Sequence, residues 1–302
     1  MVTLLVTGAS GFLAGYLLQY LSRVQNGPAN IHGISRGPHN LQGLCETHYC
    51  DLQNFRGLSE IIKEISPNCI FHLAGSFSNN VLRDYRNNVL VTENLLNAII
   101  KNGDLSTRVV VIGSSAEYGN VQLPGSEISE ASQLNPTSVY GLTKVVQTRL
   151  TRFYFKEFGV QSIMARPFNI IGRGLSETLF VGRVQILIEK LMRGKLEYIE
   201  LGNMSSSRDY VDVEDVVSAL ILLMERGEAG QLYNIGSGRL IKMIDLLRLI
   251  LEVWCIPETK VRFSAGTTED DGGSYSADLT KISELGWKPQ FDIISSVKKL
   301  RR

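Results

Sequence analysis

Two side chains near the middle of the sequence have the types and spacing needed to move a proton. Tyr140 and Lys144 lie four positions apart in a segment with helical periodicity, so a phenol and an ammonium share one helix face. A nearby cation favours phenolate, so we expect Lys144 to lower the pKa of Tyr140 and suit it for proton exchange with an alcohol or ketone. With eleven tyrosines in the sequence, a Tyr-x-x-x-Lys spacing also arises readily by chance.

Two hydroxyls upstream make this pair more informative. Ser114 and Ser115 follow closely on the apolar run Val109–Ile112, which predicts a buried strand. Ligands of open α/β sheets bind at the carboxyl ends of the strands. We therefore expect a serine hydroxyl and the Tyr140 phenol to meet in one site.

A glycine-rich segment near the N-terminus could bind a dinucleotide. It follows a predicted strand and opens a predicted helix, with Gly8 for a tight turn and Gly11 for close approach of a pyrophosphate. Ala14 stands where such motifs place a small residue for packing of the helix on the strand. A purely structural strand-to-helix turn is the alternative.

The end of the second predicted strand indicates which dinucleotide would bind. Sites specific for NAD place a carboxylate there, whereas the 2′-phosphate of NADP needs a cation. This sequence has Ser35 and Arg36, which favours NADP, although Arg36 could be an ordinary surface charge. Asp51 and Leu52, after the next strand, are candidates for contact with adenine, but Asp51 could also be a turn residue.

The segments that must position these residues alternate between two kinds. The predicted strands are Thr3–Val6, Ile31–Ile34, Cys69–Leu73, Val109–Ile112 and Ser162–Ala165. The predicted helices between them are Leu13–Val24, Leu58–Ile65, Val89–Ile100 and Val139–Phe158. The alternation predicts an α/β fold, a Rossmann-type doubly wound parallel sheet with helices on both faces.

The pattern becomes less regular after about residue 170, where we expect a smaller C-terminal lobe that binds the substrate. Its predicted elements are the helices Phe180–Met192, Val213–Met224 and Ile241–Val253 and the strand Glu197–Leu201. We place an NADP-binding domain at residues 1–170 and the lobe at residues 171–302. No linker separates the two parts, so the boundary near residue 170 is approximate, and we expect segments of the domain and the lobe to interleave.

Composition excludes several classes of function. The 302 residues carry a formal net charge of +1, without the basic excess of a nucleic-acid surface. We expect no membrane span and no secretory signal, because no apolar run is long enough and the N-terminus lacks a basic region. The four cysteines show no Cys-x-x-Cys spacing, so we expect no metal site, no disulfide framework and a cytoplasmic location.

Seven landmarks spread over nearly the whole sequence carry a family resemblance. They are Thr7–Gly15, His72–Gly75, Gly113–Gly119, Tyr140–Lys144, Arg166–Asn169, Ser207–Val213 and Gly286–Pro289. In this order the sequence resembles the extended short-chain dehydrogenase/reductases, the NAD-dependent epimerase/dehydratase family. Within that family it is most similar to the GDP-4-keto-6-deoxy-D-mannose reductases, through residues 166–172, 207–213 and 230–238.

The resemblance implies roles for individual residues. Tyr140 would be the acid/base, and Lys144 would bind the nicotinamide ribose and tune Tyr140. Ser114 would hold the substrate oxygen, with Ser115 as a lesser candidate. Together, the motifs and the resemblance assign the cofactor to a set of residues in the first domain. These are Gly8, Ser10, Gly11, Phe12, Leu13, Ser35, Arg36, Asp51, Leu52, Leu73, Ala74, Gly75, Lys144 and Arg166.

The resemblance further implies that Asn169 and Arg208 face the diphosphate of the substrate, a task that suits the planar guanidinium. A loop-capping amide and a surface salt bridge are the structural alternatives. Many relatives also carry an Arg at the position that matches Thr268 here, which leaves Arg183 as a candidate substitute for substrate binding.

One departure from the family bears on the reaction. Family dehydratases place two acids directly after the active-site hydroxyl, and Ser115 and Ala116 occupy those positions here, which argues against dehydration. Glu117 is a carboxylate one position further on, and on an extended segment it would face the opposite side.

These observations favour an NADPH-dependent reductase of the C4 ketone of a nucleotide-linked 4-keto-6-deoxyhexose, GDP-linked in preference to dTDP-linked. The first alternative is a sugar-nucleotide 4-epimerase, which recycles one bound NAD and needs no phosphate-selective site. The second is a non-catalytic dinucleotide-binding regulator. We also expect a homodimer through the apolar helices 89–100 and 139–158, although a buried monomer core explains the same residues.

Overall fold

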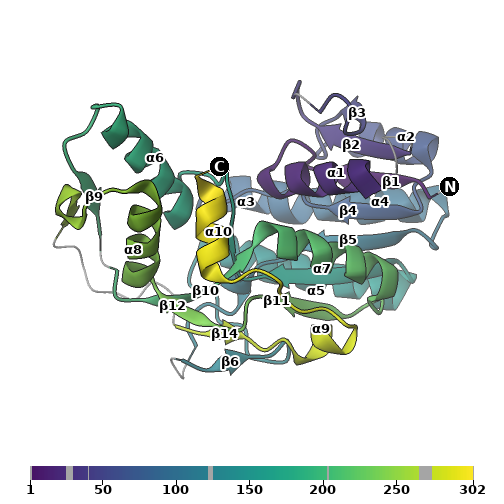
Figure 1. Cartoon of the computed structure of the whole chain (residues 1–302). Coiled ribbons are helices and arrows are strands. Elements are labelled where there is room, and N and C mark those ends of the chain that lie inside the picture. The colour runs from purple at the N-terminus through teal and green to yellow at the C-terminus, as the bar shows by residue number, and fades with distance from the viewer. Residues whose placement is uncertain are drawn as a thin grey trace.

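A seven-stranded parallel sheet forms the centre of the protein (Figure 1). The computed structural model describes residues 2–24, 30–39, 41–121, 125–202, 204–264 and 274–301. The strand order is β11-β7-β5-β4-β1-β2-β3, which confirms the predicted Rossmann-type α/β fold. The strands are β1 (Leu4–Thr7), β2 (Ile31–Ser35), β3 (Glu46–Tyr49), β4 (Cys69–His72), β5 (Arg108–Ile112), β7 (Gln161–Pro167) and β11 (Leu232–Ile235).

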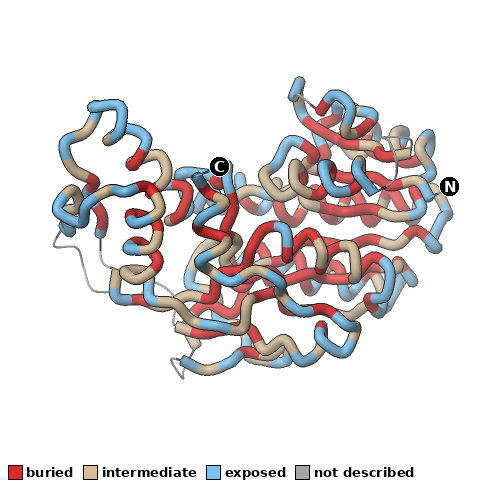
Figure 2. Tube along the Cα trace, viewed as in Figure 1, coloured by how far each residue is buried: buried red, intermediate tan, exposed pale blue. Residues whose placement is uncertain are grey.

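Helices cover both faces of this sheet. In front of it in Figure 1 lie α1 (Phe12–Val24) and α7 (Val213–Arg226), and one hydrophobic core joins them to the strands. On the other face a second core joins the strands to α2 (Phe55–Ile65), α4 (Val91–Asn102) and α5 (Val139–Phe158). The central strands are apolar without alternation because both of their faces are buried, as Figure 2 shows.

A smaller lobe, on the left of Figure 1, lies beside the carboxyl ends of these strands. Its three-stranded sheet consists of β8 (Asn169–Ile171), β10 (Ser207–Asp212) and β12 (Leu240–Lys242). Three helices pack around a third core, namely α6 (Phe180–Met192), α8 (Met243–Trp254) and α10 (Ile293–Leu300). The remaining elements are the pairs β9 (Ile199–Leu201) with β13 (Val261–Phe263) and β6 (Glu127–Ile128) with β14 (Ser276–Ala277), and helix α9 (Thr280–Glu284).

Two strands of the main sheet were not given bounds from the sequence, although a strand was expected just before Asp51. β3 is a polar edge strand, Glu-Thr-His-Tyr, and therefore lacks an apolar run. β11 comes from the second half of the chain and pairs with β7. Whether residue 170 separates two folding units stays a prediction.

The helix predicted from residue 89 is preceded by irregular turns. A short helix α3 (Val81–Asp84) leads into a π-helical stretch, Tyr85–Leu90, before α4 begins. Such wider turns often occur at functional sites. Across the described residues, no helix combines the length and the apolar character that a membrane crossing requires.

Candidate active site

A crevice of about 770 Å³ opens at the carboxyl ends of the central strands, where β1 lies between β4 and β2. This is the point at which the chain changes sides of a doubly wound sheet, and ligands of such folds bind there. Twelve of the residues that the sequence analysis assigned to catalysis, cofactor or substrate line the crevice. They are Gly8, Gly11, Phe12, Leu13, Leu73, Gly75, Ser114, Ser115, Tyr140, Lys144, Asn169 and Arg208.

The glycine-rich loop between β1 and α1 forms one end of the crevice. Gly8 has φ +69°, and a Cβ on it would lie 2.8 Å from the backbone of Ala74, so this position requires glycine. Helix α1 begins at Phe12, in the lining of the crevice, and the first backbone N–H groups of a helix have no partner within it. Ala14 is buried against the sheet. These features fit the pyrophosphate of a dinucleotide.

The residues expected to select the cofactor follow β2 and β3 at the same edge of the sheet. The Ser35 hydroxyl is buried and donates a hydrogen bond to the carbonyl of Gly37, 2.8 Å away, while Arg36 is exposed. Asp51 accepts the N–H of Gln53 at 3.0 Å, which is turn geometry. Leu52 is buried in the second hydrophobic core. These residues, like the exposed Ser10, do not line the crevice itself.

Ser114, Tyr140 and Lys144 converge in the crevice. Helix α5 begins at Val139, directly after its capping residue Ser138, so Tyr140 and Lys144 occupy its first two turns. Ser114 follows β5 and is hydrogen-bonded to the Tyr140 hydroxyl. The Lys144 ammonium is 2% exposed and donates to the carbonyl of Ile112 and to Oε1 of Gln147, each 2.9 Å away.

The electrostatics of Tyr140 differ from the sequence-based expectation. Burial raises its pKa to about 12, opposed by the hydrogen bond with Ser114 and reinforced by the charges of Glu117 and Asp84. Burial also lowers the pKa of Lys144 to about 8. The expectation that Lys144 lowers the pKa of Tyr140 is therefore wrong for the protein alone, because desolvation dominates and the ammonium is held by other partners. A neutral phenol is suited to donating a proton.

Glu117 was not predicted as part of the site. The segment Ser115–Glu117 is a 3₁₀ turn rather than extended, and it turns the carboxylate into the interior, where it is fully buried. The carboxylate accepts the N–H of Ser114 at 3.0 Å and the hydroxyl of Thr148 at 2.7 Å. The Ser-x-x-Glu spacing, which marks a capping box, could have identified it.

Arg166 is buried beside Glu117. It is 1% exposed, forms an ion pair with Glu117 at 2.6 Å and stacks 4.5 Å from the ring of Tyr118. The crevice lining does not include it. β7 directs the Arg166 side chain to the buried carboxylate of Glu117, and contact between Arg166 and the cofactor stays a prediction.

A chain of hydrogen bonds runs from Lys144 into the interior. Gln147 accepts from Lys144 and donates to Thr92 at 2.8 Å, and Thr92 in turn contacts Nε2 of His72 at 2.9 Å. Because the Thr92 hydroxyl donates to the carbonyl of Asn88, Nε2 of His72 must carry the proton. Burial, and secondarily the charge of Lys144, lowers the pKa of His72 to about 3. The chain therefore holds Lys144 with neutral partners.

Three of the expected substrate residues, Asn169, Arg183 and Arg208, belong to the smaller lobe, whereas Ser115 follows β5 of the main sheet. Asn169 donates from its amide to the carbonyl of Asp209 at 3.0 Å, and Arg208 donates to the carbonyl of Ser207. Both line the crevice, as does Ser115. Arg183 is exposed on α6 and does not line it, and Thr268 lies outside the described residues. The structure adds Phe77, whose ring packs edge-on against Tyr140, and Tyr275, whose hydroxyl donates to the carbonyl of Ser115; no sequence motif marked either one.

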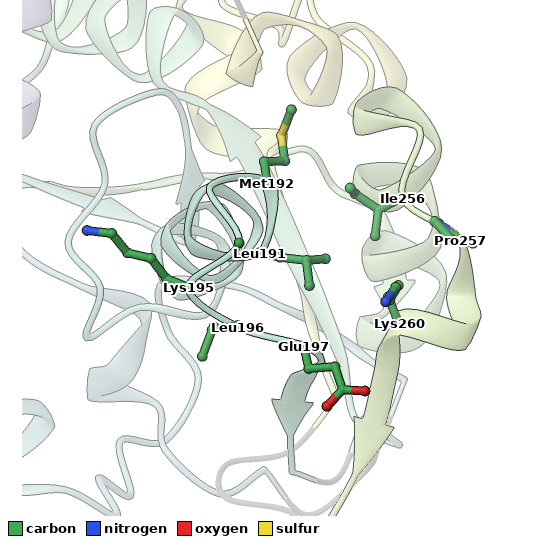
Figure 3. Close-up of a pocket in the computed structure, with 9 residues that line it drawn as sticks. Leu191, Met192, Lys195, Leu196, Glu197, Ile256, Pro257 and Lys260 are labelled. Atoms are coloured by element: carbon green, nitrogen blue, oxygen red, sulfur yellow. The ribbon is translucent and has the colours of Figure 1, made fainter.

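A second hollow of about 560 Å³ lies at the outer end of the smaller lobe (Figure 3). Its described lining comes from the end of α6 and the segment after α8, with Leu191, Ile256 and Lys260 among them. Residues of the Ser114, Tyr140 and Lys144 set are not in that lining. The chemistry therefore belongs to the crevice at the sheet.

A doubly wound sheet, a glycine-rich loop and a Ser, Tyr and Lys set in one crevice define the architecture of an extended short-chain dehydrogenase/reductase. The sequence pattern of the NAD dependent epimerase/dehydratase family matches residues 4–236. The chain belongs to this family, and membership indicates an enzyme.

Similar proteins include reductases and epimerases of sugar nucleotides. GDP-6-deoxy-D-mannose reductase of Pseudomonas aeruginosa is 29% identical over 304 residues, covering 98% of this chain and 95% of the relative. The structure of RMD from Pseudomonas aeruginosa complexed with NADPH has a TM-score of 0.82 at 27% identity, covering 99% and 98% of the two chains. The structure of a UDP-glucose 4-epimerase from Thermotoga maritima with UDP-glucose has a TM-score of 0.86 at 25% identity. The match covers 99% of this chain and 97% of the epimerase.

Proposed function

We propose that this protein is an NADPH-dependent reductase that converts the C4 ketone of a nucleotide-linked 4-keto-6-deoxyhexose to an alcohol. The observation that carries the direction of the reaction is Arg36, exposed directly after β2 with no carboxylate beside it. An enzyme that consumes its reduced cofactor each turn draws on the NADPH pool, and a cation at this position suits the 2′-phosphate. The reductase relative and the NADPH complex of RMD support the same choice.

The crevice residues divide the chemistry among them. When bound, the reduced nicotinamide supplies a hydride to the ketone carbon. The Tyr140 phenol, neutral at physiological pH, donates its proton to the oxygen that gains charge. Ser114 hydrogen-bonds the same oxygen, so charge is stabilised where it develops. Lys144 binds the nicotinamide ribose, and its ammonium is already oriented by Ile112 and Gln147.

The substrate end of the proposed site is formed by Asn169 and Arg208. Both line the crevice from the smaller lobe, and a guanidinium can contact two phosphate oxygens at once. We propose that they face the diphosphate of the sugar nucleotide, GDP-linked in preference to dTDP-linked. A cytoplasmic location remains a prediction.

A 4-epimerase is the alternative that the structural similarity to the UDP-glucose 4-epimerase favours. Such an enzyme interconverts isomers without net loss of NADPH. A non-catalytic regulator is disfavoured because Ser114, Tyr140 and Lys144 are all in place within one crevice.

We also propose a homodimer in which α5 pairs with its copy. Leu142, Val146 and Phe153 lie on one face of α5 and are 54%, 39% and 52% exposed. An apolar stripe of this kind at helical spacing is typical of a helix that packs against another helix.

Tyr140→Phe tests the proposed chemistry. The variant keeps the ring and loses the proton, so turnover should fall about 10²–10⁴-fold while NADPH binding, measured by fluorescence titration, stays near that of the parent protein. Turnover close to the parent value would contradict the assignment of Tyr140.

A further inference from the structure

Three potential metal ligands meet on the outer strands of the main sheet. His32 lies on β2, and Glu46 and His48 lie two residues apart on the edge strand β3. The register pairs His32 with Glu46 and Ile34 with His48, so all three side chains project from the same face of the sheet. This cluster lies outside the lining of the catalytic crevice.

The separations of the ligand atoms are close to those of a metal site. Nδ1 of His32 lies 3.0 Å from Nε2 of His48 and 3.6 Å from a carboxylate oxygen of Glu46. Nε2 of His48 lies 4.0 Å from the other oxygen of that carboxylate. Ligands about 2.0–2.1 Å from a tetrahedral Zn²⁺ stand roughly 3.3 Å apart. One ligand atom from each residue can be chosen so that all three lie within 4.8 Å of one another, so the exposed Glu46 side chain would have to turn to bring one oxygen to both imidazoles.

The chemistry of the cluster suits a transition metal. A transition-metal ion binds the neutral form of an imidazole through the lone pair of one ring nitrogen. The two imidazoles are about 15% exposed while Glu46 is 70% exposed, so an ion in solution can reach the cluster from the side of Glu46. Two imidazoles and one carboxylate form a known zinc ligand set.

We propose that His32, Glu46 and His48 bind a divalent transition-metal ion of the Zn²⁺ class. The fourth position would be taken by water. Bound there, the ion would join the polar edge strand β3 to β2, stabilising a strand that has few apolar contacts of its own. The sequence-based expectation of no metal site considered only the cysteines, whereas β-strand register brings these three residues together.

Equilibrium dialysis of the full chain tests this proposal. After treatment with EDTA and its removal, the protein is dialysed against ZnCl₂ near pH 7.5, and bound zinc is measured by elemental analysis. We expect one equivalent of zinc, a melting temperature higher by about 5 °C at a hundredfold excess over the dissociation constant, and no comparable effect of Mg²⁺. With Co²⁺ as the probe, the visible absorption bands of a low-coordinate site should appear.

Variants localise the site. His48→Gln should abolish the zinc equivalent, and Glu46→Gln, at an exposed position that leaves folding intact, should weaken binding at least about tenfold. His39→Gln is the matched control, because His39 is an exposed histidine outside the cluster and its loss should change nothing. Absence of bound zinc in the parent protein would overturn the proposal and leave a hydrogen-bonded cluster only. Zinc binding that survives in both cluster variants would also overturn it.

Discussion

The buried ion pair between Glu117 and Arg166 gives a quantitative prediction. Glu117 and Arg166 are 0% and 1% exposed and lie 2.6 Å apart. The substitution Glu117→Gln removes the negative charge and keeps an acceptor for the N–H of Ser114. The Arg166 charge is then left buried without its partner, which costs about 3–5 kcal/mol of folding free energy. For a chain of this length the melting temperature should fall by roughly 6–10 °C.

The same substitution should alter catalysis in a defined direction. The charge of Glu117 raises the pKa of both Tyr140 and Lys144. With that charge removed, both pKa values fall, so the basic limb of the pH profile of kcat/KM should move to lower pH. A residue with a purely structural role would leave the position of this limb unchanged.

A double-mutant cycle separates the ion pair from other effects. Urea unfolding is measured for Glu117→Gln, Arg166→Met and the double variant. Because the double variant has no unpaired charge, its loss of stability should be smaller than the sum of the two single losses by at least about 2 kcal/mol. Additive losses within about 0.5 kcal/mol, or a loss below about 1 kcal/mol for Glu117→Gln, would refute this reasoning.

Three further predictions follow from single residues. Arg36→Asp should raise the KM for NADPH about tenfold or more and improve the use of NADH, as measured by steady-state kinetics with both cofactors; an unchanged preference would make Arg36 a surface charge only. Below its ordinary pKa of 6.5 the unfolded chain protonates His72, whereas the folded chain keeps it neutral down to about pH 3, so stability is lost as pH falls. Between pH 7 and pH 5 urea unfolding should show a loss of about 2 kcal/mol from this residue, absent in His72→Asn and retained in His39→Gln. Phe153→Glu should convert the dimer to a monomer in light scattering, and a parent protein that is monomeric at all concentrations would contradict the dimer.

Much of the fold could be predicted because its elements carry local signals. Runs such as Val109–Ile112 are apolar because both faces of a central parallel strand are buried. The helix Val139–Phe158 has the bounds predicted from its periodicity, with Ser138 as its cap. Strand β3 was expected before Asp51 but its bounds could not be predicted, because an edge strand needs no apolar run and its pairing depends on β2 rather than on its own sequence.

The candidate site was predictable only in part. Motifs located Gly8, Ser114 and Tyr140, since each has a type and a position that the chemistry requires. The direction of a side chain was harder to predict. Arg166 faces a buried carboxylate rather than the crevice, and its partner Glu117 is 49 residues away in the sequence. Likewise, the effect of burial on Tyr140 outweighs that of Lys144, which depends on packing that spacing alone does not contain.

The most direct test of the proposed function is the oxidation of NADPH, followed at 340 nm, with NADH in parallel. The substrates are GDP- and dTDP-linked 4-keto-6-deoxyhexoses, each generated in place by a matching dehydratase. The account predicts stoichiometric loss of NADPH with one of the two nucleotides, GDP in preference, and formation of the alcohol. No loss of NADPH with either, together with interconversion of sugar-nucleotide isomers on chromatography, would contradict the reductase and identify an epimerase.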